Sequence, residues 1–186
     1  MKTEEIIIAG FGGQGVLSMG QMLAYSAMID NKETSWMPSY GPEMRGGTAN
    51  CVVIVSETRI SSPLVTKFDT AIILNQPSME KFEKAVKPGG SLFYEESTII
   101  QPPMRTDINI YRISALREAE RLNKKQVANM VMLGAFLEVK PIVDFQSILA
   151  ALKKVLPERH HHLIPVNEQA LLKGKEIIAE YLKEPV

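Results

Sequence analysis

The segment from Ile6 to Val16 constrains the fold of this chain more than any other. Three isoleucines run into a glycine-rich loop, and a helix-like pattern begins directly after it. Gly10, Gly12 and Gly15 occupy the three positions of a Gly-x-Gly-x-x-Gly motif. In this strand–turn–helix context we expect them to allow, in that order, a tight turn, close approach of a ligand, and close packing of the helix on the strand.

A phosphate-bearing ligand would suit this loop, because free backbone amides and the positive end of a helix dipole meet there. The motif by itself does not identify the ligand. The residues predicted to line such a site are Gly10, Gly12, Gly13, Gln14 and Gly15.

The composition restricts the class of protein. The chain has 186 residues, which suits a single domain spanning residues 1–186. Its formal net charge is zero, so it lacks the basic surplus expected of a nucleic-acid-binding protein. No apolar run approaches the roughly 20 residues that span a bilayer. The one cysteine and the absence of a signal-like N-terminus lead us to expect a cytoplasmic protein.

The hydrophobic pattern alternates between strand-like and helix-like segments. The strand before the glycine loop is apolar on both faces, which predicts a central position in a sheet. The predicted strands are the one ending near residue 9 and those at 48–55, 69–74, 91–94 and 108–113, and the predicted helices span 16–28, 78–86, 114–122, 127–139, 145–156 and 167–182. This order predicts an α/β fold: a Rossmann-like three-layer domain with a mostly parallel sheet and a helical C-terminal part.

Two of these segments raise further expectations. The helix at 127–139 is apolar on most faces, so it must be covered by the domain core or by another subunit, and a homodimer of the isolated chain is one expectation. The Pro88-Gly89-Gly90 sequence is expected to form the turn that closes the preceding helix.

Residues 35–50 form a second segment rich in special residues, which we interpret as a structured loop carrying recognition groups. The planar guanidinium of Arg45 can donate two parallel hydrogen bonds to a carboxylate or a phosphate, and Glu43 is placed to orient this guanidinium. Trp36 and Tyr40 can stack on a ligand or fill a pocket. The alternative is a purely structural loop with an internal Glu43–Arg45 pair. The candidate ligand-binding residues here are Tyr40, Glu43, Arg45, Gly46 and Gly47.

Other polar residues are weaker candidates. Cys51 lies in a strand-like segment and is expected to be a core residue, since no neighbour in the sequence would activate it as a nucleophile. The histidines at 160–162 point in different directions and are interpreted as a solvated helix end, not a metal site. Asn129 on the apolar helix is either a polar contact in an interface or a residue bonded to its own surroundings.

A nicotinamide-dependent dehydrogenase is the first alternative that the glycine motif suggests. Such a fold requires an acidic residue about 20 positions past the glycines, at the end of the second strand. Asp30 and Glu33 lie near that offset, but the sequence after Glu33 leads into the proline- and glycine-rich segment and does not read as a clear strand. The dehydrogenase reading therefore has weak support.

The two glycine-rich segments together resemble the gamma subunit of the 2-oxoacid:ferredoxin oxidoreductases. The matching pieces span nearly the whole chain in the order of the family. Within it, residues 16–21 and 36–38 look most like the enzymes for 2-oxoglutarate, followed closely by those for branched-chain 2-oxoacids. The matching pieces are residues 10–15, residues 39–47, residues 129–134, and Asn167, Ala170 and Gly174.

The resemblance implies the reaction of a 2-oxoacid with coenzyme A and oxidised ferredoxin to give acyl-coenzyme A, carbon dioxide and reduced ferredoxin. It also implies that thiamine diphosphate, Mg²⁺ and [4Fe–4S] clusters are held by the alpha, beta and delta subunits. The lone cysteine and the lack of a Gly-Asp-Gly thiamine diphosphate motif agree with this division. We therefore expect one component of a complex, inactive alone, whose two loops either position coenzyme A or only dock on the partner subunits.

Overall fold

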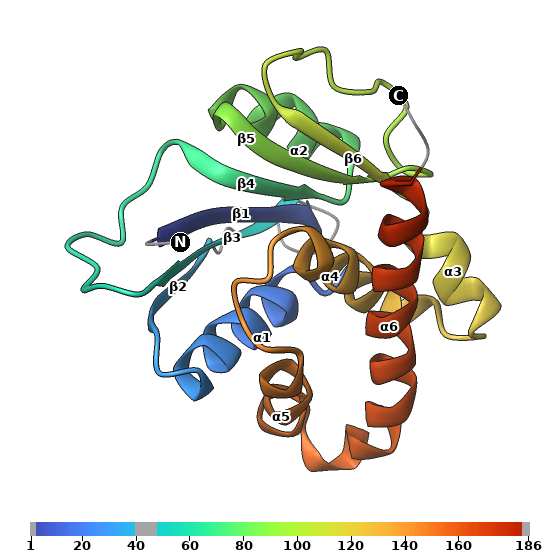
Figure 1. The fold of residues 1–186 in the computed structure, drawn as a ribbon. Helices are drawn as coiled ribbons and strands as arrows, with labels where there is room; N and C mark the ends of the chain where they lie inside the picture. The colour runs from blue at the N-terminus through green and yellow to red at the C-terminus, as the bar shows by residue number, and fades with distance from the viewer. Residues whose placement is uncertain (1–2, 40–47, 184–186) are drawn as a thin grey trace.

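A computed structural model describes residues 3–39 and 48–183 of the chain. In this part of the chain a six-stranded sheet forms the centre of the molecule (Figure 1), and its strands are arranged in the order β2-β3-β1-β4-β5-β6. The strands are β1 (Thr3–Phe11), β2 (Glu33–Ser39), β3 (Thr48–Ser56), β4 (Phe68–Ile73), β5 (Val86–Glu95) and β6 (Asn109–Ile113).

The sheet is mixed, and a single strand runs against the others. The pairs β1–β4, β4–β5 and β5–β6 are parallel, whereas β3 is antiparallel to both of its neighbours, β1 and β2. Because β2 is reversed twice relative to β1, it runs in the same direction as β1, and only β3 is opposed. The α/β class with a mostly parallel sheet is thus confirmed.

Helices cover the two faces unequally. The helices α1 and α4 lie on one face, with α5 packed on α1 and α6 packed along α4, while the short α2 lies on the other face (Figure 1). This gives three layers with a thick helical side toward the C-terminus. The helices are α1 (Val16–Ile29), α2 (Gln76–Phe82), α3 (Ala115–Arg121), α4 (Ala128–Val139), α5 (Phe145–Val155) and α6 (Ile164–Tyr181), and 3₁₀ turns occur at Glu83–Ala85, Lys125–Val127 and Glu158–Leu163.

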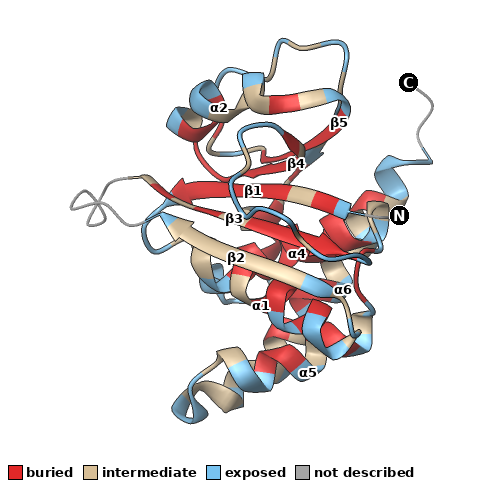
Figure 2. Cartoon of the chain, turned by 90° about the vertical axis from the view of Figure 1, so that its left-hand side faces the viewer, coloured by how far each residue is buried: buried red, intermediate tan, exposed pale blue. Residues whose placement is uncertain are grey.

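Strand β1 separates two hydrophobic cores, one on each face of the sheet. Ile6 and Ile8 belong to the larger core with α1 and α4, whereas Ile7 and Ala9 belong to the smaller core with α2. This division follows from the two-residue period of a strand, which sends alternate side chains to opposite faces. Figure 2 shows the strand buried along most of its length. The predicted central position of this strand is confirmed.

The apolar helix α4 is enclosed by its own chain. A Cβ atom added at Gly134 would collide with the backbone of Leu171 on α6, and one added at Gly174 would collide with the backbone of Val131 on α4. The two helices therefore cross at a distance that only glycine permits at these points. Because α6 and the sheet cover α4, this helix gives no support to the expected homodimer.

Two local expectations were wrong. Residues 33–39 form the edge strand β2, paired with β3 along its length, where we expected a loop. Pro38 had pointed away from a strand, but an edge strand tolerates proline because one of its sides has no ladder to complete. Residues 88–90 lie inside β5 and do not end a helix; a register shift between Phe68 and Thr70 and the positive φ of Gly89 accommodate them.

Candidate functional site

The glycine loop joins β1 to α1, and the side chain of Gln14 ties it to the next strand. Oε1 of Gln14 accepts a hydrogen bond from the amide of Phe11 at 2.6 Å, and its Nε2 donates to the carbonyl of Leu74 at 3.1 Å. The amide of Gln14 also donates to the carbonyl of Phe11. One side chain therefore closes the loop on itself and fixes it to the end of β4.

The glycines perform roles that differ in part from those expected. The left-handed backbone conformations belong to Gly13, with φ of 96°, and Gly15, with φ of 74°. Gly10 is instead required for space, because a Cβ atom there would lie 2.6 Å from Oε1 of Gln14 and 2.9 Å from Cβ of Leu74. The tight turn thus depends on the dihedral angles of the later glycines, and Gly10 makes room for the loop to fold back.

Asn129 connects the loop to α4. Its Nδ2 donates to the carbonyl of Gly15 at 3.3 Å, and a Cβ atom added at Gly15 would lie 2.8 Å from Cγ of Asn129. Gly15 therefore permits close packing against α4, where we had expected packing of its own helix on the strand. Of the two interpretations of Asn129, the structure supports a side chain bonded within its own chain.

A cavity of about 200 Å³, which we call the strand-end cavity, lies beside the loop at the carboxyl ends of β1, β4 and β5. The chain leaves β1 toward β2 on one side of the sheet, and returns to β4 on the other side. Such a reversal of strand order is where open α/β sheets bind their ligands. The cavity is lined by Gly13, Gln14, Leu74, Glu95, Ala115, Leu116, Lys125, Gln126, Ala128 and Asn129.

Glu95 is a buried carboxylate in this cavity that sequence reasoning missed. It is 2% exposed and accepts hydrogen bonds from the hydroxyl and amide of Ser97, at 2.7 and 3.0 Å, and from the amide of Leu116, at 3.0 Å. These contacts hold the start of α3 against the end of β5. An acid at the carboxyl end of a predicted parallel strand was the signal available in the sequence.

A second cavity, of about 300 Å³, lies where α1 begins, and we call it the helix-start cavity. Among the residues that the structure describes, no side chain caps the N-terminus of α1. The first amides of a helix lack internal partners, so they are available to an acceptor in this cavity. The lining residues are Phe11, Gly12, Gly13, Gly15, Val16, Leu17, Ser18 and Ala49.

The second predicted constellation lies mostly outside the described residues. Tyr40, Glu43, Arg45, Gly46 and Gly47 belong to the undescribed residues 40–47, so their predicted roles stay predictions. The flanking residues are placed: β2 ends at Ser39, and Thr48 at the start of β3 pairs with Phe11 of the glycine loop. The carboxyl end of β2 and the amino end of β3 therefore both lie at the end of the sheet where β1 leads into the glycine loop.

Cys51 has the environment of a core residue. It is fully buried, and its Sγ lies 3.6 Å from the carbonyl of Val16. Burial raises the pKa of the Cys51 thiol to about 12, so the reactive thiolate is not populated near neutral pH. Gly20 lets α1 approach this strand, because a Cβ atom there would lie 2.5 Å from Sγ of Cys51 and 3.0 Å from Nε1 of Trp36. Trp36 thus packs against the core and is not a free stacking platform.

The residues considered for a dehydrogenase lie far from the loop. Asp30 caps the opposite end of α1, about 20 Å away at 1.5 Å per residue. Its carboxylate accepts from the amide of Asp144 at 2.6 Å and from the hydroxyl of Ser147, which fixes the start of α5. The last described residue of β2 is Ser39, so within the described residues no acid stands at the carboxyl end of this strand. This geometry weighs against nicotinamide binding.

The three histidines occupy the 3₁₀ turn Glu158–Leu163. A ring nitrogen of His161 lies 2.9 Å from the carbonyl of Leu156. Within residues 3–39 and 48–183, no group of three His, Cys, Asp or Glu side chains could hold a metal ion. The same residues include no helix long and apolar enough to cross a membrane.

The sequence of this chain is similar to those of a known protein family and of several individual proteins. Residues 5–177 match the pyruvate ferredoxin/flavodoxin oxidoreductase family. The 2-oxoglutarate synthase subunit KorC of Methanocaldococcus jannaschii is 35% identical over 180 residues, which cover 95% of each chain. The ketoisovalerate oxidoreductase subunit VorA of Methanothermobacter thermautotrophicus is 37% identical over 177 residues, covering 95% of this chain.

The lengths of these relatives differ. The present chain spans only 36% of VorA, so the matching unit is part of a much longer polypeptide there. A solved structure of the gamma subunit of a keto/oxoacid ferredoxin oxidoreductase from Geobacter sulfurreducens is also similar, with a TM-score of 0.81 and 27% identity. That likeness covers 95% of this chain and 99% of the other.

Proposed function

Because this chain belongs to the pyruvate ferredoxin/flavodoxin oxidoreductase family, we propose that it is the gamma subunit of a 2-oxoacid:ferredoxin oxidoreductase. In this proposal the complex converts a 2-oxoacid, coenzyme A and oxidised ferredoxin into acyl-coenzyme A, carbon dioxide and reduced ferredoxin. The observation that carries it is the match over nearly the full length of both chains to a free-standing subunit of such an enzyme.

The proposed substrate is 2-oxoglutarate. The relative KorC belongs to a 2-oxoglutarate synthase, and its match to the present chain covers 95% of both sequences. Identity alone does not separate the substrates, since VorA is 37% identical and KorC 35%. A branched-chain 2-oxoacid or pyruvate is therefore the alternative. Rates of coenzyme A-dependent ferredoxin reduction with each 2-oxoacid would decide among them.

The other subunits, in this proposal, hold thiamine diphosphate, Mg²⁺ and the [4Fe–4S] clusters. A cluster is normally held by several thiolates, and the only cysteine here is buried with its thiol protonated. When bound by its own subunits, thiamine diphosphate supplies the carbanion chemistry of decarboxylation. The contribution of the present chain is then to bind and orient a substrate at the edge of that site.

We assign coenzyme A to the end of the sheet where β1 leads into the glycine loop. The strand-end and helix-start cavities flank the loop, and the uncapped amides of α1 suit a phosphate group. Arg45, outside the described residues, would add positive charge from the neighbouring segment. The competing possibility is that the loop serves only to dock this chain on its partners.

Ser18 provides a sharp test, because it lines the helix-start cavity, is exposed, and occupies the first turn of α1. Ser18→Asp places a negative charge where it stabilises a helix but repels a phosphate. In the reconstituted complex we expect the KM for coenzyme A to rise by about tenfold, equivalent to about 1.4 kcal/mol. The neutral variant Ser18→Asn is the matched control and should change KM little.

The two roles of the loop predict different results. If the loop only docks the subunit, Ser18→Asp leaves the KM for coenzyme A unchanged and alters the concentration of chain needed for assembly. The same pair of measurements applies to Arg45→Ala. A complex with full turnover in the absence of this chain would contradict both roles.

A further inference from the structure

The strand-end and helix-start cavities differ in charge, so they suit different parts of one ligand. The described residues that line the helix-start cavity include no acid, and the first amides of α1 face it. The strand-end cavity contains the carboxylate of Glu95, which is 2% exposed. Because like charges repel strongly where water is excluded, a phosphate would be repelled beside this carboxylate. The strand-end cavity is therefore suited to an uncharged group.

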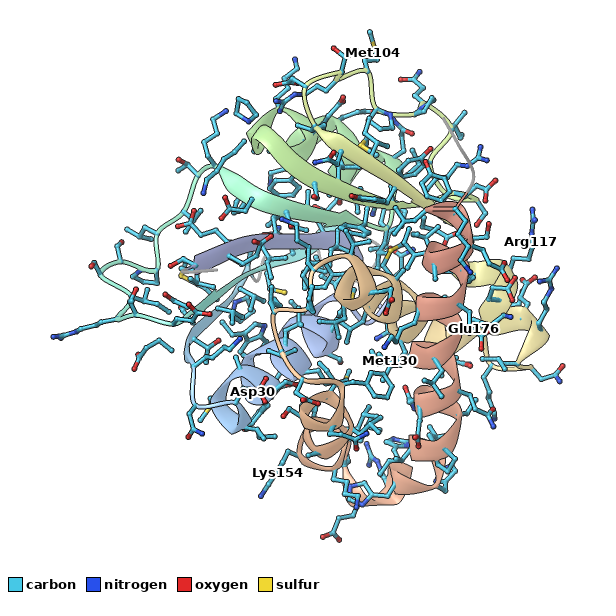
Figure 3. All side chains as sticks on the ribbon, viewed as in Figure 1. Asp30, Met104, Arg117, Met130, Lys154 and Glu176 are labelled. Carbon is cyan, nitrogen blue, oxygen red and sulfur yellow. The ribbon has the colours of Figure 1, made fainter. Side chains whose placement is uncertain are left out.

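Positive charge near the strand-end cavity does not offset the charge of Glu95. Lys125 is the one cation among its described lining residues. The Lys125 side chain is 72% exposed and pairs with Glu120 at 2.8 Å, so it lies at the rim and already has a partner. Arg117 on the neighbouring helix α3 is exposed and points away from the sheet (Figure 3).

Glu95 has an acceptor position left for a ligand. A carboxylate offers about four lone-pair positions on its two oxygens and donates no hydrogen bond. Among the described residues, Oε1 accepts from the amide and the hydroxyl of Ser97, and Oε2 accepts from the amide of Leu116. The remaining position belongs to Oε2. The part of a ligand that meets it must carry an N–H or an O–H group.

Asn129 adds a second acceptor and a donor to the same cavity. One N–H of its Nδ2 is used by the carbonyl of Gly15, which leaves the other N–H free. Its Oδ1 has no hydrogen-bond partner among the described residues and is not one of their fully buried unpaired atoms. A carboxamide in this state can pair with adenine through two hydrogen bonds, one with the amino group and one with a ring nitrogen.

The size and the walls of the cavity agree with a single planar base. Its volume of about 200 Å³ is below the range of about 300–1,000 Å³ that is usual for pockets holding a whole ligand. Gly13 lines this cavity and the helix-start cavity, so one ligand can occupy both. The aliphatic wall consists of Leu74, Ala115, Leu116 and Ala128.

We propose that the strand-end cavity binds the adenine base of coenzyme A, and that Glu95 and Asn129 accept hydrogen bonds from its exocyclic amino group. This inference deepens the proposed function and rests on it for the identity of the ligand. The diphosphate then lies in the helix-start cavity, against the amides of α1. Hypoxanthine is rejected, because it carries a carbonyl oxygen in place of the amino group and would face two acceptors.

The pantetheine arm of coenzyme A is the other uncharged part that could enter the cavity. A pantetheine amide has a single N–H, whereas the amino group of adenine has two. With the amide, one of the two acceptors on Glu95 and Asn129 would be left without a donor in a site closed to water, which is unfavourable. The count of donors therefore favours the base.

The test titrates the purified full chain with adenosine and with inosine, which contains hypoxanthine, and follows binding by isothermal titration calorimetry. Neither nucleoside carries a phosphate, so the response reports on the strand-end cavity. We expect adenosine to bind at least about tenfold more tightly than inosine, because a site that pairs with the amino edge of adenine discriminates against a base without it.

Glu95→Gln replaces the open acceptor with an N–H donor and should reverse this preference, so that inosine binds at least as tightly as adenosine. The variant also removes an acceptor from the amide of Leu116, so its melting temperature should fall by about 2–4 °C. A purely structural role of Glu95 predicts a different result, in which both nucleosides bind more weakly and their ratio stays the same.

Ala128→Leu tests the cavity without removing a polar group. Ala128 is half-buried and lines the cavity, so a larger side chain there takes up the space of the base. We expect the affinity for adenosine to fall at least about tenfold. Ala150→Leu is the matched control, because Ala150 is exposed on α5 and lines neither cavity at the glycine loop. It should leave the affinity within about twofold of wild type.

Competition identifies the molecule that supplies the base. Coenzyme A should displace adenosine from the wild-type chain, whereas pantetheine, which lacks adenine, should not. Displacement by pantetheine would place the other end of coenzyme A in the cavity and contradict the proposal. Stronger displacement by ATP than by coenzyme A would also contradict it, because the cavity would then serve a different adenine nucleotide.

Three further results would overturn the proposal: no binding of adenosine to the wild-type chain, equal affinities for adenosine and inosine, or an unchanged ratio of the two in Glu95→Gln. Failure of the proposed function looks different. In that case the chain prefers adenosine and releases it to coenzyme A, but no 2-oxoacid supports coenzyme A-dependent reduction of ferredoxin by the reconstituted complex.

Discussion

The contact between Gly15 and Asn129 allows a quantitative test of how the glycine loop is held. Gly15 has φ of 74°, a conformation that costs a residue with a Cβ atom about 1–2 kcal/mol. An added Cβ would also lie 2.8 Å from Cγ of Asn129, so that side chain would have to move away. Its hydrogen bond to the carbonyl of Gly15 would be lost at a cost of about 1 kcal/mol.

These two costs set the expected size of the effect. Gly15→Ala should lower the free energy of unfolding by about 2–3 kcal/mol, which is the sum of the backbone and hydrogen-bond costs. For a domain of this size that corresponds to a melting temperature lower by about 4–12 °C. Asn129→Ala should cost about 1 kcal/mol, because it removes the same hydrogen bond.

The double variant separates the two contributions. In the Asn129→Ala background the hydrogen bond and the contacts with Nδ2 and Cγ are gone, and only the contact with Cβ of residue 129 at 3.3 Å remains, so Gly15→Ala should cost little more than the backbone strain, about 1–2 kcal/mol. The coupling energy between the two sites is therefore about 1 kcal/mol. Urea denaturation of the wild type, both single variants and the double variant measures it directly.

Gly13→Ala is the control for backbone strain alone. Gly13 has φ of 96°, but an added Cβ atom there meets no atom of the described residues within 4 Å. It should therefore destabilise the chain without any coupling to Asn129. A coupling energy between Gly15 and Asn129 below about 0.3–0.5 kcal/mol, which is the limit of additivity, would refute the contact as described.

Two further predictions concern the core. Gly174→Ala should destabilise the chain by about 2 kcal/mol, because the collision with the backbone of α4 outweighs the gain of about 1 kcal/mol in helix propensity. The control is Gln169→Ala, at an exposed position on the same helix. A raised melting temperature of Gly174→Ala would contradict the close crossing of α4 and α6. For Cys51, the folded-state pKa of about 12 lies above the ordinary value of 9.0, so the thiol loses its proton at a lower pH in the unfolded chain than in the folded one. The free energy of unfolding therefore falls as pH rises between these two values, by up to about 1.4 kcal/mol per pH unit. Unfolding free energies measured from pH 9 to 11 should fall more steeply for the wild type than for Cys51→Ala, and parallel pH profiles would show that the thiol is not buried as described.

The local pattern of the sequence was sufficient for most of the fold. The alternation along β1, the glycines after it and the long apolar run of α4 each reflect interactions between residues close in the chain. They therefore predicted a central strand, a strand–turn–helix unit and a buried helix. The errors fell at Pro38 and at residues 88–90, where proline and glycine suggested a loop or turn but an edge position and a bulge accommodated them.

The site could be predicted only in part, for the same reason. The glycine loop was identified from its motif, but Gln14, Glu95 and Asn129 acquire their roles from partners distant in sequence. Asn129 contacts Gly15 across 114 positions of chain, and no local pattern encodes that distance. Ile100 is likewise exposed beside the buried Ile99 in a loop whose amides at Ile100 and Met104 donate to the side chains of Gln76 and Glu83, which are distant in sequence.

The sequence by itself therefore determined the class of fold, the position of the glycine loop and the family to which the chain is similar. Periodicity and short motifs depend on residues close together in the chain, so they can be recognised without knowing how the chain packs. Only the tertiary structure decided which glycine provides the turn, which side chains hold the loop, that α4 is covered by its own chain, and that Ile100 and Met104 are left exposed. Those outcomes depend on distances between segments, and the distances exist only once the sheet and helices have packed together.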